Sequence, residues 1–228
     1  ARRYTPADGS IVLRISQDRT GARFSVTDTA ATVPVVYNGI LPDLTPSSHT
    51  TLDALSLQQH LHHYAQQGAT FAALEASSHG LEQGRLCGTP IEVAVFSNLS
   101  RDHLDYHGDM AAYAAAKARL FGWPTLHTAV LNADDPASAV MQAACAPSVR
   151  VWRYSLVDAS AGFFVRSAQF SLQGADLCIQ TPAGELAVHS PLLGRFNVAN
   201  LLAVVAAAMA LGVGLEALRA AIPRLRGA

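Results

Sequence analysis

The sequence predicts an α/β fold, a mostly parallel sheet flanked by helices with a small antiparallel β insertion. From about residue 50 to residue 155, short apolar runs typical of buried strands alternate with helical segments, which is the pattern of a parallel sheet covered by helices. Between residues 163 and 189, three alternating segments separated by glycine-containing turns predict an antiparallel meander. A length of 228 residues suits one large domain.

The first part of the chain predicts few elements. Residues 11–15 and 23–26 alternate with period two around Gly21, which indicates a short hairpin. Residues 33–37 are apolar enough for a buried strand, and a loop rich in proline and serine follows at residues 42–48.

The alternating region predicts three helices. The first carries an apolar stripe made of Leu55, Leu57, Leu61 and Tyr64 and ends at Gly68. The other two lie at residues 110–121, with Asp109 as the N-cap, and at residues 136–144. The strands between them are predicted at residues 70–75, 92–98, 128–132 and 149–154.

The last third of the chain predicts the meander and two closing helices. Its strands are expected at residues 163–170, 175–180 and 185–189, and the helices at residues 197–211 and 215–221. Gly174 and Gly184 supply the turns of the meander.

Composition limits the class of protein. Half of the residues are hydrophobic, 14% are charged and the formal net charge is −1. The chain can therefore bury a full core, and it is too apolar to be an extended disordered chain. The longest apolar stretch, residues 201–211, is too short for a membrane span, and the charge gives no basic surface for nucleic acid. We expect no nucleic-acid partner and no membrane insertion.

The cysteines and the chain start add two expectations. Cys87, Cys145 and Cys178 are odd in number and lack metal-ligand spacing, which is typical of reduced thiols and predicts a cytoplasmic location. The chain begins at Ala1 without Met or a signal sequence, so we expect it to be a fragment.

Polar side chains follow three predicted strands, at residues 75–80, 98–103 and 132–135. In open α/β sheets, ligands bind beyond the carboxyl ends of the strands. Carboxylate, imidazole and amide groups there could hold Mg²⁺ or orient a phosphorylated ligand. Each cluster alone could equally consist of helix caps and loop residues, but three in successive loops favour a ligand site.

Three further features carry possible chemistry. His103 and His107 are four residues apart, as in some zinc sites, but HExxH is absent and Gly108 favours a turn. Lys117 stands among alanines; it is by default a surface lysine, although a partly desolvated lysine loses its proton more easily and becomes a nucleophile. Asn197 and Asn200 near a helix start would suit an adenine, a ribose or a phosphate, unless Asn197 is an ordinary N-cap.

Taken together, these residues resemble the Mur ligase family, and within it the enzymes that add the third amino acid to the cell-wall precursor. The resemblance covers roughly residues 32–222, and its longest motif, Asp-His-Leu-Asp-Tyr-His-Gly-Asp-Met at residues 102–110, is unusual. It implies the family's central, ATP-binding domain over residues 32–228, with residues 1–31 as an unaligned segment. The matching strings are residues 49–51, 75–85, 96–110, 115–117, 132–135 and 194–202.

The resemblance also implies roles for single residues. Lys117 would be carbamylated by CO₂ to N6-carboxylysine, which turns a cation into an anion near the metal. Mg²⁺ would be bound by Glu75 and His103, and the adenosine end of ATP by Asn200 and Asp135. The substrate UDP-MurNAc-L-Ala-D-Glu would contact His49, Thr50, Thr51, Ser77, Gln83 and Arg85.

The implied activity is an ATP-dependent amide ligation in peptidoglycan biosynthesis. The substrate carboxylate would attack the γ-phosphate of ATP to give an acyl phosphate and ADP, and the amine of diaminopimelate or lysine would then displace phosphate. Two alternatives are a ligase of the folylpolyglutamate synthase type and a degenerate, non-catalytic binding module.

The sequence departs from the family in three places. It contains no GxxxxGK(S/T) phosphate loop, which the family carries upstream of the strand near Val33. The N-terminal domain that grips the uridine nucleotide and the C-terminal domain that selects the amino acid have no counterpart. We therefore expect an incomplete central domain with little or no activity on its own.

Overall fold

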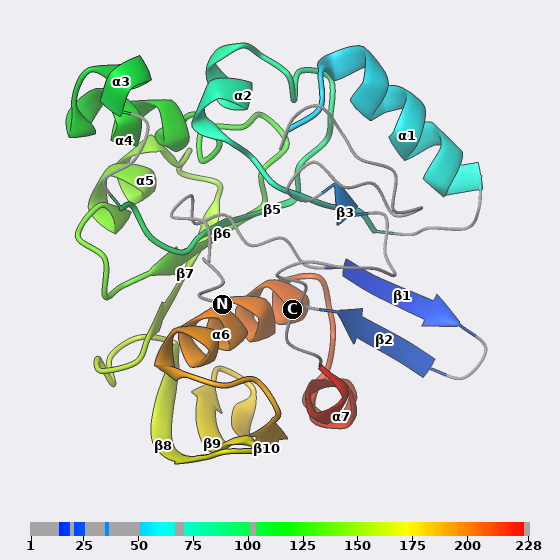
Figure 1. Ribbon diagram of the computed structural model, residues 1–228, viewed down its shortest axis with the longest axis vertical. Helices are drawn as coiled ribbons and strands as arrows, with labels where there is room; N and C mark the ends of the chain where they lie inside the picture. Colours follow the sequence, from blue (N-terminus) through cyan, green and yellow to red (C-terminus); the bar gives the residue numbers. More distant parts are fainter. Residues whose placement is uncertain are drawn as a thin grey trace.

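The computed structural model describes residues 14–18, 21–25, 35–36, 51–66, 71–100 and 104–225. Its main sheet has six strands in the order β10-β9-β8-β7-β6-β5 (Figure 1). The strands from β5 to β8 pair in parallel, and β8, β9 and β10 pair antiparallel. This confirms the predicted mostly parallel sheet with an antiparallel insertion. The bounds are β5 Val93–Phe96, β6 Thr128–Asn132, β7 Arg150–Ser155, β8 Phe163–Ser171, β9 Gly174–Thr181 and β10 Gly184–Ser190.

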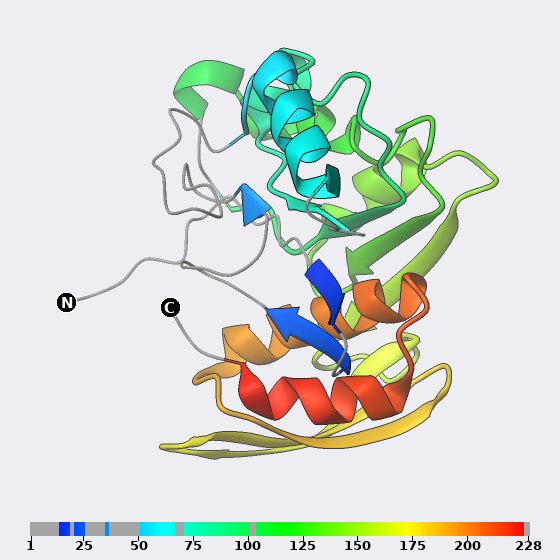
Figure 2. The ribbon, with the colours of Figure 1, turned by 90° about the vertical axis from the view of Figure 1, so that its right-hand side faces the viewer.

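Strands β5 and β6 are mostly apolar because helices cover both of their faces. In β6, Val130 packs into a core formed with α6 (Arg195–Ala210). Its neighbours Ala129 and Leu131 point to the opposite face, into a core shared with α1, α4 and α5. Figure 2 shows these two layers, with α1 to α5 on one side of the sheet and α6 and α7 on the other. The bounds are α1 Ala54–Gln66, α4 Met110–Ala118, α5 Ser138–Ala144 and α7 Leu215–Ala221.

Helix α6 is buried on nearly all sides. Residues 201–208 are all buried, since α6 packs against β5 to β8, and α7 packs against β10 beside it. A helix that is apolar all round is stable only in such an enclosed position. Its many alanines keep it thin enough to fit there.

Short elements complete the fold. β1 (Arg14–Asp18) and β2 (Gly21–Ser25) form the predicted hairpin. β3 (Val35–Val36) pairs in parallel with β4 (Ala73–Leu74), so the strand predicted at residues 70–75 is shorter than expected. A 3₁₀ turn, Ile222–Arg224, follows α7. Within the described ranges, no helix has the length and apolar character needed to cross a bilayer.

Several local predictions are corrected. Leu55 was expected in the buried stripe of α1 but is 70% exposed, whereas Leu57 is buried. The short helices α2 (Ser78–Glu82) and α3 (Leu104–His107) lie where loops were expected. The Gly68 helix stop lies outside the described residues.

Of the two predicted helix caps, one is confirmed and the other is wrong. Asp109 caps α4 as expected, since its Oδ1 accepts from the N–H of Ala112 at 2.8 Å. Asn197 as an N-cap is wrong, because α6 already begins at Arg195 after Gly194. The Asn197 amide instead donates back to the carbonyl of Leu193 at 2.8 Å.

Candidate functional site

Thr51 organises the segment that follows β4. Its hydroxyl donates to the carbonyl of Glu75 at 2.8 Å and accepts from the N–H of Ser77 at 2.9 Å. The Ser77 hydroxyl lies 3.0 Å from the Thr51 hydroxyl and accepts from the N–H of Gly80 at 3.1 Å. Ser77 is thus the N-cap of α2, so the helix-cap interpretation of this cluster is also correct.

Arg85 joins the same unit. Its Nη1 donates to the carbonyl of Thr51 at 2.8 Å, and its Nε donates to Oε1 of Gln83 at 2.9 Å. Four residues predicted to bind the substrate (Thr51, Ser77, Gln83 and Arg85) therefore form one hydrogen-bonded group. The other two, His49 and Thr50, lie outside the described residues.

Lys117 is not a surface lysine. Only 4% of the residue is exposed, although it lies in the last turn of α4. Its Nζ is 5.5 Å from the ring centroid of Tyr113, one helical turn earlier. Lys117 is also the only lysine in the 228-residue sequence, which otherwise uses 15 arginines as its basic residues. A buried lysine is rare in proteins and marks a candidate reactive group.

Glu75 follows β4 directly and is 4% exposed. A buried carboxylate is costly unless a cation or hydrogen bonds compensate it, and carboxylate oxygen is the donor that Mg²⁺ prefers. The donor chemistry of Glu75 therefore fits the expected metal. His103, the second expected ligand, lies outside the described residues. Within the described ranges, no three His, Cys, Asp or Glu residues are arranged to hold a metal ion.

Asp135 ties together the loops that follow two neighbouring strands. Its Oδ2 accepts from the N–H of Leu99, beyond β5, and its Oδ1 accepts from the N–H of Ala137, beyond β6, both at 2.8 Å. Asn132 reinforces this link, since its amide donates to the carbonyl of Ser97 at 2.6 Å. Asp135 thus shapes the carboxyl edge of the sheet through backbone contacts.

Asn200 belongs to the same edge of the sheet. Ala207 and Leu211, at the far end of α6, line a pocket together with Val93 at the start of β5. Helix α6 therefore runs antiparallel to the parallel strands, and its first turns, which include Asn200, lie toward the carboxyl edge.

His107 was considered only as a zinc ligand, and that interpretation does not fit its surroundings. Its side chain is 1% exposed, Nε2 lies 2.9 Å from the Ser78 hydroxyl, and Nδ1 lies 3.7 Å from Oε2 of Glu82. The ring stacks on Tyr113, with centroids 5.2 Å apart and an interplanar angle of 24°. Both ring nitrogens therefore face side chains of α2.

Comparison with known proteins decides the family. The sequence-family model that describes the Mur ligase middle domain matches residues 18–208 of this chain. The chain belongs to the Mur ligase family.

The relatives of this Mur ligase chain are named consistently. UDP-N-acetylmuramoyl-L-alanyl-D-glutamate–2,6-diaminopimelate ligases from Ectopseudomonas mendocina and Pseudomonas aeruginosa are each 44% identical, over 96% and 92% of this chain. The chain spans only 43% and 42% of the length of these two relatives. A solved structure of a ligase with the same name is 50% identical with a TM-score of 0.77, covering 87% of this chain and 41% of that one.

A more distant branch of the fold is also similar. Mycobacterium tuberculosis folylpolyglutamate synthase, solved with ADP, is 26% identical with a TM-score of 0.52, over 61% of this chain and 32% of that one. The Mur ligase chain therefore shares more of its sequence and of its fold with the diaminopimelate ligase structure than with this synthase.

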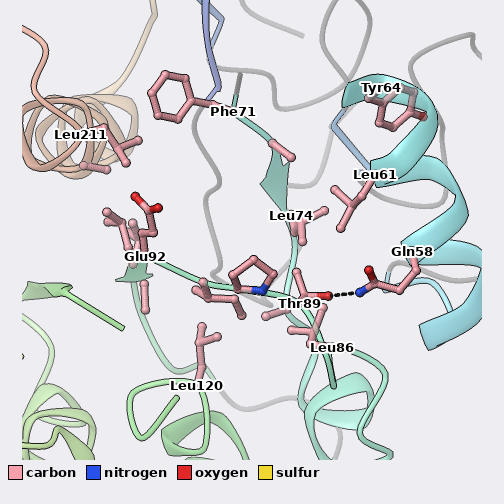
Figure 3. A pocket seen from close by; sticks show the side chains of 18 of the residues that line it. Gln58, Leu61, Tyr64, Phe71, Leu74, Leu86, Thr89, Glu92, Leu120 and Leu211 are labelled. Atoms are coloured by element: carbon pink, nitrogen blue, oxygen red, sulfur yellow. Dashed lines mark hydrogen bonds between the residues drawn. The ribbon is translucent and has the colours of Figure 1, made fainter. Parts of the chain in front are cut away.

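The Mur ligase chain also has an apolar pocket close to these residues. A pocket of about 490 Å³ separates β4 from β5 and is bounded by α1 (Figure 3). Its described lining is mostly apolar, and at its edge Gln58 donates to the Thr89 hydroxyl at 2.8 Å. Of the predicted site residues that the structure describes, none lines it.

Gly80 gives the first mutational prediction. A Cβ at this position would lie 2.8 Å from both Cβ and Cγ2 of Thr51, so a side chain here must displace the residue that holds Glu75 and Ser77. We expect Gly80→Ala to lower the free energy of unfolding by roughly 1–3 kcal/mol. Urea unfolding measures this.

The matched control for Gly80→Ala is Gly214→Ala. Gly214 has φ −78°, and its Cβ would meet no atom within 4 Å. Gly214 is also the N-cap of α7, where alanine is less favourable than glycine, so we expect this variant to lose only about 0.5 kcal/mol. Equal stability of the two variants would contradict the tight contact between Gly80 and Thr51.

Proposed function

We propose that the chain is the central domain of an ATP-dependent ligase that joins diaminopimelate to UDP-MurNAc-L-Ala-D-Glu during peptidoglycan precursor synthesis. The hydrogen-bonded group of Thr51, Ser77, Gln83 and Arg85 carries this proposal, because residues assigned to one substrate lie together beside the buried Lys117 helix. The names of the relatives support diaminopimelate over lysine. The expected cytoplasmic location stays a prediction.

Arg85 is the residue we assign to the anionic part of the substrate. A guanidinium group has five N–H donors, and two of them are directed to Thr51 and Gln83. These two bonds fix the plane of the group. The remaining donors suit a carboxylate or a phosphate, which a guanidinium binds in a two-pronged manner. His49 and Thr50 would extend this surface.

We assign the carbamate to the side chain of Lys117. Its neutral amine would attack the carbon of CO₂, so that an N–C bond forms, one C–O double bond becomes a C–O⁻ single bond, and the nitrogen loses a proton to water. The products are a carbamate and one released proton. Burial of the Lys117 side chain would keep bulk water from the adduct.

Glu75, His103 and the carbamate oxygens are the groups we assign to Mg²⁺. The bound ion would neutralise charge on the phosphoryl group that is transferred from ATP. Thr51, Ser77 and Arg85 would bind the dipeptide rather than the metal. They would orient the carboxylate of the dipeptide for reaction. Asn200 and Asp135, at the carboxyl edge of the sheet, are assigned to the adenosine end.

The missing phosphate loop limits what the 228 residues can do alone. Lys117 is the only lysine among these 228 residues, so none of the residues before it in this sequence is a lysine that could contact the β- and γ-phosphates. We therefore expect weak Mg-ATP binding and little turnover by this chain.

Two measurements on the chain test the proposal. Isothermal titration should show weak Mg-ATP binding but detectable binding of UDP-MurNAc-L-Ala-D-Glu. Phosphate release is then assayed with that nucleotide and either diaminopimelate or lysine, and separately with folate and glutamate. Binding of the muramyl nucleotide supports the proposal, with release only in the diaminopimelate arm if turnover is detectable. Folate-dependent release, or no muramyl binding, overturns it.

A further inference from the structure

The buried contacts of His107 are not explained by the proposed reaction. The residue ends α3, just before Gly108 turns the chain into α4 with φ +81°. Its ring lies between two helices that carry different parts of the site. On one side are Ser78 and Glu82 of α2, and on the other is Tyr113 of α4.

The contacts resemble a Ser-His-Glu hydrolase triad, but this function does not fit. Ser78 is fully buried in the first turn of α2, so its hydroxyl cannot reach a substrate. The Glu82 carboxylate is 3.7 Å from Nδ1, which is longer than a hydrogen bond. The three groups therefore hold elements together.

The contacts of His107 connect it to two parts of the site, the predicted substrate-binding residues and Lys117. Ser78 follows Ser77, which bonds to Thr51 and so connects to Arg85. Tyr113 is fully buried between the His107 ring and Lys117, whose Nζ lies 5.5 Å from the ring centroid. A shift of the His107 ring would move α2 relative to Lys117.

We propose that His107 is a positioning residue that holds α2 against α4 and thereby places Lys117 for carbamylation. The inference rests on the proposed function, because it concerns the carbamate assigned to Lys117. It goes further in naming a residue outside the substrate and metal contacts that sets how readily the carbamate forms.

Carbon-13 NMR of the chain with labelled bicarbonate tests this inference. The carbamate signal is titrated with bicarbonate in the wild type, in His107→Gln and in Ser78→Ala. His107→Gln removes the ring stacked on Tyr113, and Ser78→Ala removes the hydroxyl partner of Nε2. We expect each variant to raise the half-saturating bicarbonate concentration about fivefold or more. His62→Ala, on the exposed side of α1, is the control and should change it less than about twofold.

The outcomes separate this inference from the proposed function. Circular dichroism shows whether each variant folds, and if His107→Gln does not, Ser78→Ala decides alone. Folded variants that titrate like the wild type overturn the role of His107 and leave the Lys117 assignment intact. A wild-type chain without any lysine carbamate signal overturns the Lys117 assignment, and the inference with it.

Discussion

Lys117→Arg is expected to abolish the lysine carbamate signal when the chain is labelled with bicarbonate. A guanidinium group stays protonated in proteins and offers no neutral amine to CO₂, so the charge is kept while the chemistry is lost. Because Lys117 is the only lysine, the remaining signal in this variant can come only from the amino group of Ala1. We also expect any phosphate release that the chain supports to fall by about 10²- to 10³-fold.

Lys117→Met separates the loss of the carbamate from a loss of folding. Methionine fills a buried site of similar length without a charge, so we expect this variant to be at least as stable as the wild type in urea, and equally free of a lysine carbamate. A carbamate signal that persists unchanged in Lys117→Arg would show that the modified group is not Lys117.

The largest effect on stability is expected at Leu201. Its side chain is fully buried in α6, in the core that includes Val130, Tyr154 and Phe163. Truncation leaves a cavity between the helix and the sheet, so we expect Leu201→Ala to lower the free energy of unfolding by about 3–5 kcal/mol in urea.

Leu172→Ala is the matched control for Leu201→Ala. Leu172 is 90% exposed, so the same truncation should change the free energy of unfolding by less than about 0.5 kcal/mol. A loss below about 1 kcal/mol for Leu201→Ala would mean that α6 is not packed in the core as described.

The sheet was predictable because the residue types of its strands indicate how deeply each strand is buried. β6 is mostly apolar since helices cover both of its faces, and β9 begins at a turn glycine, Gly174, with φ +132°. Helix α6 was predictable for the same reason, because an unbroken apolar helix of this length must be enclosed. Both features can be read from the residues within each segment, without knowledge of distant contacts.

The corrections have two different causes. Leu55 lies two positions before Leu57, roughly 200° around the helix, so helical periodicity itself places it opposite the apolar stripe, where it is exposed. Helix α2 spans only five residues and is held by Ser77 and Thr51, which are 26 positions apart, so periodicity could not reveal it.

The candidate site was partly readable. The motif resemblance named Thr51, Ser77, Gln83 and Arg85 together, and the structure joins them by hydrogen bonds that could not be predicted from spacing. The sequence left open whether Lys117 is buried. One observation could have indicated a special role: the chain has 15 arginines but a single lysine, and arginine cannot replace lysine where a neutral amine is needed. His107 was missed because its partners come from a separate helix.

A crystal structure of the chain grown with Mg²⁺, bicarbonate and UDP-MurNAc-L-Ala-D-Glu tests the account most directly. We predict electron density for a carboxylate joined to Nζ of Lys117, and one magnesium ion bound by that group, Glu75 and His103. An unmodified Lys117, with the Glu75 and His103 side chains directed to separate regions of the molecule, would contradict it.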